Sequence, residues 1–144
     1  MRARRWLTGA AAAVSLITSA WASPAQDYML YCMGCHGAEA QGVPGKVPPL
    51  AHALGDYMRT PEGRNYVLRV PGAASSVLSD AQLAAVLNWV ALRFSGTQLA
   101  ANVTWFTPEE VAQVRHTPLV DVLATRREVV RLLAASGDAP GLDY

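Results

Sequence analysis

The sequence predicts an all-α protein, and three observations support this class. At five points a serine or threonine stands directly before a proline or an aspartate: Ser23, Thr60, Ser79, Thr107 and Thr117. Such residues cap the first turn of a helix, and proline suits the first helical position. Apolar residues then recur at helical spacing, and no strand-like run precedes the two cysteines of the chain.

The first 22 residues have the pattern of a cleaved signal peptide. A basic stretch, Met1–Arg5, precedes an apolar run from Trp6 to Ile17, and Ala20-Trp21-Ala22 is a small-x-small cleavage site. The run is shorter than the roughly 20 residues that span a bilayer, and serine and threonine interrupt it. We therefore expect cleavage after Ala22 and export to the periplasm, rather than a retained membrane anchor.

The mature chain is expected to be slightly acidic. Loss of the signal peptide reduces the 12 basic residues to nine, against 11 acidic ones. The basic residues are scattered and only Lys46 is a lysine, so the composition does not indicate nucleic-acid binding. About 120 residues make one domain, or one small domain with an extension. No nucleotide-binding loop or Ser-His-Asp set is present, and the chain is short for an enzyme, so catalysis is not the first hypothesis.

The sequence CMGCH, residues 32–36, contains both cysteines and a histidine directly after the second. A thioredoxin-like redox pair would follow a strand and begin a helix, whereas these cysteines follow a predicted helix over residues 24–31. That helix has Ser23 as its cap and Gln26 in the capping-box position. A structural zinc site would need a second pair of ligands, which the chain lacks.

Covalently bound haem explains all three residues of this Cys-x-x-Cys-His motif. The thiols of Cys32 and Cys35 can add to the two vinyl groups of haem, and His36 is then the proximal iron ligand. Export agrees with this interpretation, because haem c is attached outside the cytoplasm.

With this motif the chain resembles the class I c-type cytochromes over roughly residues 24–95. The family carries an aromatic residue four positions before the first haem cysteine, here Tyr28, and a proline and a leucine after a glycine-rich loop, here Pro48 and Leu50. The resemblance implies that the Pro48 carbonyl accepts a hydrogen bond from His36 and orients its ring.

The resemblance also implies a core of three to four helices around one haem, closed by a helix packed across the first one. The stretch LSDAQLAAVLNWVALRF, residues 78–94, supplies this helix. Ser79 is its predicted cap, with Gln82 in the capping-box position, and Trp89 resembles the aromatic residue that this helix carries in many relatives.

The distal iron ligand is the open point of this resemblance. The family usually takes a methionine from the loop before the last core helix, but residues 69–80 contain none. Met1 leaves with the signal peptide, Met29 belongs to the first helix, and Met33 lies between the cysteines. The predicted distal ligand is therefore Met58. His52, His116 and an open or water-bound site remain as alternatives.

A short helix is predicted after Thr60, with Pro61 in its first turn and Pro71-Gly72 as its stop. Arg64 and Arg69 lie on it. They either form a solvated face, or bind a haem propionate or line the surface for a partner.

Residues 96–144 form a predicted helical extension. One helix begins at Thr107-Pro108 with Glu110 in the capping-box position, and a second is predicted from Thr117-Pro118 to Gly137. The apolar stripe of the second helix is expected either to pack on the core or to contact a partner or a second copy. Arg126, Arg127 and Arg131 then face solvent or an acidic partner.

The predicted organisation is a signal peptide (1–22), a cytochrome c haem domain (23–95) and the extension (96–144). We expect a periplasmic monohaem electron carrier whose partner is a redox protein such as a dehydrogenase or terminal oxidase, acting free or as a cytochrome subunit. The alternative is a haem protein with an open distal site that acts as a ligand sensor or a small peroxidase.

Overall fold

The computed structural model of the chain describes residues 22–95, 99, 101–135 and 137. These residues form helices and one isolated bridge between Val43 and Val47, and they contain no strand, so the predicted all-α class is confirmed. The helices are α1 (Pro24–Tyr31), α2 (Met33–His36), α3 (Leu54–Tyr57), α4 (Pro61–Arg69), α5 (Pro71–Ala74), α6 (Asp80–Phe94), α7 (Pro108–Val114) and α8 (Val122–Ala135). The predicted signal peptide lies outside the described residues, apart from Ala22.

Four of the predicted helix starts are confirmed by their capping hydrogen bonds. Ser23 and Ser79 each form a complete capping box, with Gln26 and Gln82 respectively. The side chains of Thr60 and Thr107 accept from the backbone N–H three residues later, at the starts of α4 and α7. These polar side chains satisfy N–H groups that the first turn of a helix leaves unpaired.

The predicted start of the last helix is wrong. The helix begins at Val122 instead of after Thr117, and Asp121 Oδ1 accepts from Ala124 N at 2.8 Å. The carbonyls of Thr117 and Pro118 accept from the guanidinium of Arg69 in α4. Because these carbonyls are bound to α4, the chain there does not continue as a helix.

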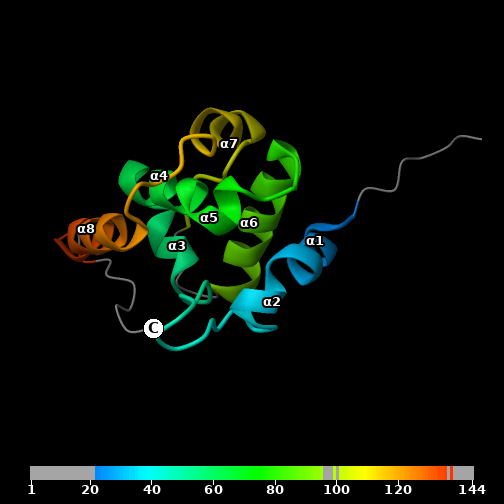
Figure 1. Cartoon of the computed structure of the whole chain (residues 1–144), viewed down its shortest axis with the longest axis horizontal. Helices are drawn as coiled ribbons and strands as arrows, with labels where there is room; N and C mark the ends of the chain where they lie inside the picture. The colour runs from blue at the N-terminus through cyan, green and yellow to red at the C-terminus, as the bar shows by residue number, and fades with distance from the viewer. Residues whose placement is uncertain (1–21, 96–98, 100, 136, 138–144) are drawn as a thin grey trace, which may run out of the picture.

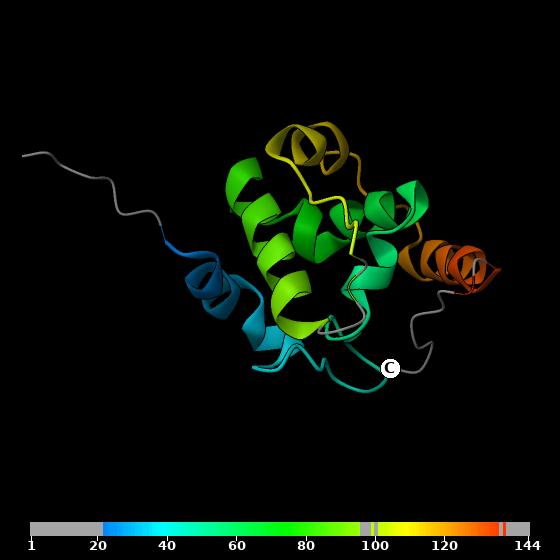
Figure 2. The ribbon, with the colours of Figure 1, turned by 180° about the vertical axis from the view of Figure 1, so that it is seen from behind.

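Helix α6 is the centre of the arrangement. It packs against α1 on one side and contacts α3 on the other, and in both views it lies between α1 and the group α3 to α5 (Figures 1 and 2). An aromatic cluster joins α1 to α6: the ring of Tyr28 lies 5.6 Å from Trp89 and 5.7 Å from Phe94. This is the crossing of first and last core helices that the sequence predicts.

The C-terminal segment, defined here as residues 101–135, contacts the helices that precede it. Helix α7 packs on α6 and α4, and α8 packs on α4 (Figure 1). Asn88 of α6 forms two hydrogen bonds of 2.9 Å with the backbone of Phe106. Arg115 donates to Leu78 O at 2.8 Å and forms an ion pair with Asp80 at 2.7 Å. Several polar contacts therefore bind this segment to the earlier helices.

Among the described residues, no helix has the combined length and hydropathy that crossing a membrane requires.

Candidate haem site

The cysteines of the motif occupy one tight helical turn. Cys32 ends α1 and begins α2, and its carbonyl accepts from the N–H groups of Cys35 and His36 at 3.2 and 3.0 Å. Both thiols are free; Cys32 is half-buried and Cys35 is exposed. Burial, together with the nearby carboxylate of Asp27, raises the pKa of the Cys32 thiol. Redox-active cysteines have a lowered pKa, so this environment disfavours a thioredoxin-like role.

The imidazole of His36 is fixed in one tautomer by the loop that follows it. Its Nδ1 lies 3.0 Å from the carbonyl oxygen of Pro48. A carbonyl only accepts, so Nδ1 donates, and Nε2 keeps its lone pair. Burial lowers the pKa of His36, and the bond to Pro48 opposes this in part. The ring is therefore held in the neutral form with one nitrogen available, which is the form that ligates iron.

The loop between His36 and Pro48 is closed by backbone hydrogen bonds. Ala40, which is fully buried, accepts from the N–H groups of Leu50 and Ala51 at 2.8 and 3.0 Å. Gly42 has a φ of 68° and donates to His36 O at 2.8 Å. A Cβ there would lie 2.3 Å from Val47 O, so only glycine allows this close approach. This closed loop brings Pro48 to His36.

Tyr28 ties α1 to the end of the motif. It is 1% exposed, and its hydroxyl donates to Gly37 O at 2.6 Å. Burial is the main reason that the pKa of Tyr28 is raised. The sequence identifies Tyr28 only as the family's aromatic residue and misses this hydrogen bond. The hydroxyl could have indicated this bond, because a buried tyrosine usually forms a hydrogen bond with its O–H group.

Met58 follows α3 and lies in the apolar core, where it is 2% exposed. Met29 is 52% exposed, and Met33 is half-buried between the cysteines. Met58 also lines a hollow of about 400 Å³, which the described residues Arg59, Asn102, Val103 and Thr104 complete. No residue of the motif is among those that line it.

His52 and His116 are both exposed. His52 has a φ of 59° and donates its backbone N–H to Phe94 O at 3.2 Å, and His116 follows α7. Within the described part of the chain, no hydrogen bond or ring contact joins Met58, His52 or His116 to His36. The contacts thus connect the motif with Pro48 and leave the distal ligand unassigned.

Arg64 and Arg69 bind the C-terminal segment. Arg64 pairs with Glu110 and donates to the carbonyls of Thr104 and Trp105. Arg69 donates to Thr117 O and Pro118 O, and to the side chain of Asn65. Neither guanidinium is a free solvated group, which the sequence alone could not reveal.

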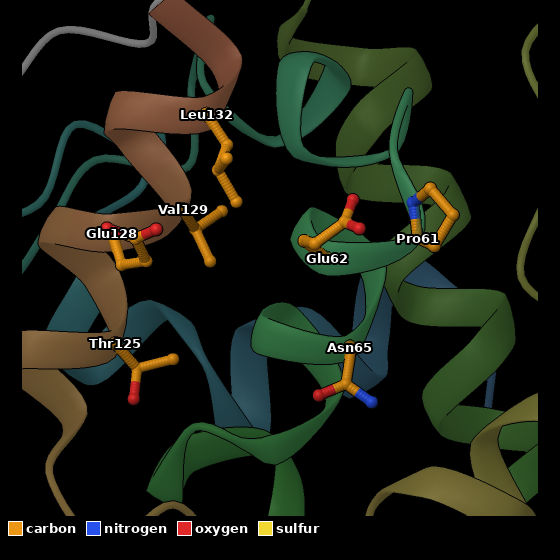
Figure 3. Close-up of a pocket in the computed structure, with 7 residues that line it drawn as sticks. All are labelled: Pro61, Glu62, Asn65, Thr125, Glu128, Val129 and Leu132. Carbon is orange, nitrogen blue, oxygen red and sulfur yellow. The ribbon is translucent and has the colours of Figure 1, made fainter.

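An open groove of about 580 Å³ lies between α4 and α8. Glu62 and Asn65 of α4 lie across it from Val129 and Leu132 of α8 (Figure 3). Pro61, Thr125 and Glu128 complete its lining. None of these residues belongs to the motif, so the groove is separate from the candidate haem site.

The side chains brought together at the motif suit covalent haem. Two unpaired thiols and a neutral imidazole belong to one turn, which is the set of groups that attaches and ligates haem c. No group of three or more His, Cys, Asp or Glu side chains that could hold a metal ion occurs in the described part of the chain. A structural zinc site therefore has no support among those residues.

Two relatives identify the family, although no family model matches the chain. The first, cytochrome c-552 of Thermus thermophilus, is 32% identical over an alignment of length 118, and the match covers 68% of this chain and 90% of the relative. A second cytochrome c-552, from a named strain of the same species, is also 32% identical, and the match covers 80% of its length. On this similarity, and in agreement with its all-helical fold, the chain belongs to the c-type cytochromes.

Proposed function

We propose that this chain is an exported class I cytochrome c with one haem, which carries single electrons between periplasmic redox proteins. The observation that carries the proposal is the geometry of His36: its Nδ1 donates to Pro48 O, so the lone pair is on Nε2, and two unpaired cysteines precede it in the same turn. The bound haem supplies a one-electron couple between ferrous and ferric iron.

The motif residues have distinct roles in this proposal. Cys32 and Cys35 anchor the haem through thioether bonds, and His36 Nε2 is the proximal ligand. Pro48 orients the imidazole and increases its basicity by accepting its Nδ1 proton in a hydrogen bond. Electron transfer needs no acid or base from the protein, so these residues act by holding the cofactor in one geometry and by setting the donor strength of His36.

Met58 is the distal ligand in this proposal. Its thioether is buried, whereas Met29 is exposed and Met33 is fixed between the two attachment cysteines. Thioether ligation raises the haem potential relative to ligation by two imidazoles, which suits an acceptor of electrons from a dehydrogenase or a donor to a terminal oxidase. The chain acts either free or as the cytochrome subunit of such an enzyme.

A second candidate function follows from the surroundings of Met58. The hollow that Met58 lines is completed by Arg59 and residues 102–104, and not by the motif. Residues 69–80 also lack a methionine. If Met58 stays in the core and neither His52 nor His116 replaces it, the distal site is open, and the protein is a ligand sensor or a small peroxidase.

Carbon monoxide and absorbance spectra separate the two candidates. For an electron carrier, the purified haem-loaded protein titrates as a one-electron couple, and its reduced form does not bind carbon monoxide without denaturation. The ferric form shows the charge-transfer band of thioether ligation, and Met58→Ala abolishes it. Rapid carbon monoxide binding by the native protein would establish the open site instead. If the measured mass of the purified protein does not include a covalently attached haem, both candidates are wrong.

A further inference from the structure

The guanidinium of Arg64 uses its donors on five acceptor atoms. Arg64 Nε and Nη2 bind the two carboxylate oxygens of Glu110 at 2.7 and 2.5 Å. Nη2 also donates to Trp105 O at 3.2 Å, and Nη1 donates to Thr104 O at 2.6 Å. The fifth contact is from Nη1 to Met58 O at 3.3 Å. An arginine side chain has five N–H groups, so its donor capacity is filled.

This side chain is also largely shielded from water. It is 12% exposed, and its central carbon lies 4.3 Å from the centre of the Phe106 ring. A charge that is removed from water in this way depends on its partners, because an unpaired buried charge is costly. The contacts of Arg64 are therefore expected to persist in solution.

The five acceptors belong to two separate parts of the chain. Thr104 and Trp105 precede α7, and Glu110 lies in its first turn, so all three belong to the C-terminal segment. The carbonyl of Met58 lies in the turn between α3 and α4, and Arg64 itself is in α4. One side chain thus links the backbone of Met58 to the C-terminal segment.

We propose that Arg64 is a positioning residue, through which the C-terminal segment holds Met58 as the distal ligand of the haem. The inference rests on the proposed ligation by Met58. The side chain of methionine has three rotatable bonds, so its sulfur stays in reach of one point only where the backbone is fixed. The bond from Arg64 to Met58 O fixes that backbone. Arg64 touches neither the motif nor Pro48.

The test compares two arginine-to-lysine variants of the haem-loaded full chain. Arg64→Lys keeps a positive charge beside Glu110 but loses the planar fork that reaches Met58, Thr104 and Trp105 together. Arg115→Lys is the matched control, because Arg115 joins the same segment to Leu78 and Asp80 without contacting Met58. The readouts are the ferric charge-transfer band, the reduction potential and the thermal unfolding midpoint.

We expect both variants to unfold at lower temperature and only Arg64→Lys to change the haem. In Arg64→Lys, the fraction of ferric molecules that lack the charge-transfer band should rise at least about tenfold, because Met58 leaves the iron more often. The reduction potential of the haem should fall for the same reason. An unchanged band and potential in Arg64→Lys, with the band lost in Met58→Ala, would overturn the role of Arg64 and leave the ligand assignment intact. A wild-type band in Met58→Ala would overturn the ligand assignment, and the inference with it.

Glu110→Gln is a second variant in case Arg64→Lys does not fold. It weakens the anchor of Arg64 and keeps the guanidinium and its bond to Met58 O. A smaller loss of the band than in Met58→Ala supports the inference. An unchanged band at a lowered unfolding midpoint counts against it.

Discussion

Nδ1 of His36 lies 3.0 Å from the carbonyl oxygen of Pro48, twelve positions later in the chain. Because Ala40 O binds the N–H groups of Leu50 and Ala51, the chain returns to the motif at this point. The imidazole orientation is therefore set by the backbone of the loop.

Pro48→Gly should loosen the orientation of His36. Its carbonyl remains, but the backbone gains freedom in the unfolded chain, so the free energy of unfolding should fall by about 0.5–1 kcal/mol. A weaker Nδ1 hydrogen bond makes the imidazole less basic and stabilises ferric iron less, so the reduction potential should rise. Potentiometry and chemical denaturation measure the two effects. Pro44→Gly, in the exposed part of the same loop, should change stability alone, and equal potential shifts in both variants would contradict the role of Pro48.

Tyr28→Phe should destabilise the protein by about 1 kcal/mol at neutral pH, because the bond from the hydroxyl to Gly37 O is lost. The same substitution should also change how stability depends on pH in the alkaline range.

The pKa of Tyr28 is raised above 10.0, mainly by burial, so the folded state keeps the phenol proton to a higher pH than the unfolded chain does. This contribution is complete below about pH 10 and is lost as the pH rises through the folded-state pKa. Denaturation measured across that range should show a shallower alkaline loss in Tyr28→Phe; an unchanged slope would contradict the prediction.

Gly63→Ala should destabilise α4 by about 1–3 kcal/mol. A Cβ at position 63 would lie 2.2 Å from Tyr57 O, a backbone atom that cannot move away alone. Gly72→Ala is the control, since a Cβ there meets nothing within 4 Å. The control should stay within about 0.5 kcal/mol of the parent in thermal denaturation. Similar losses in both variants would show that steric contact at Gly63 is not the cause.

The two carboxylates that pair with arginine in α7 and α8 should respond differently to neutralisation. Glu128 pairs with Arg131, and the two side chains are 56% and 66% exposed. Solvent and salt screen such a pair, so Glu128→Gln should leave the unfolding midpoint unchanged within error. Glu110→Gln should lower the midpoint clearly, because it deprives the shielded guanidinium of Arg64 of its countercharge. A larger fall of the unfolding midpoint in Glu128→Gln than in Glu110→Gln would contradict the argument from burial.

The helix starts were predictable because their causes are local. Ser23 with Gln26, and Ser79 with Gln82, make capping boxes whose partners lie three residues apart. The motif turn is equally local. The sequence therefore predicts the first and last core helices, and it predicts that both cysteines follow the end of the first one.

The contacts of the C-terminal segment were not predictable, because their partners are far apart in sequence. Arg64 and Glu110 are 46 positions apart, and Arg69 and Thr117 are 48. The second pair also explains why the last helix begins late. The backbone carbonyl of Thr117 accepts from Arg69 of α4, and Thr117 does not cap a helix. Capping signals alone could not distinguish these two uses of one threonine.

The distal ligand stays a prediction for a related physical reason. Thioether sulfur serves equally as apolar filling and as an iron ligand, and Met58 has the burial that either role requires. Residue type and position cannot decide between them, whereas the spectra of Met58→Ala can.

The tight turn closed by Val43 and Val47 has a practical consequence for electrochemistry. It carries Lys46, which is exposed and is the only lysine of the chain. Apart from the terminal amine, an amine-reactive linker therefore has a single point of attachment. Molecules immobilised on an electrode through Lys46 would all present the same face to the support, and the loop that orients His36 would be the part nearest to it.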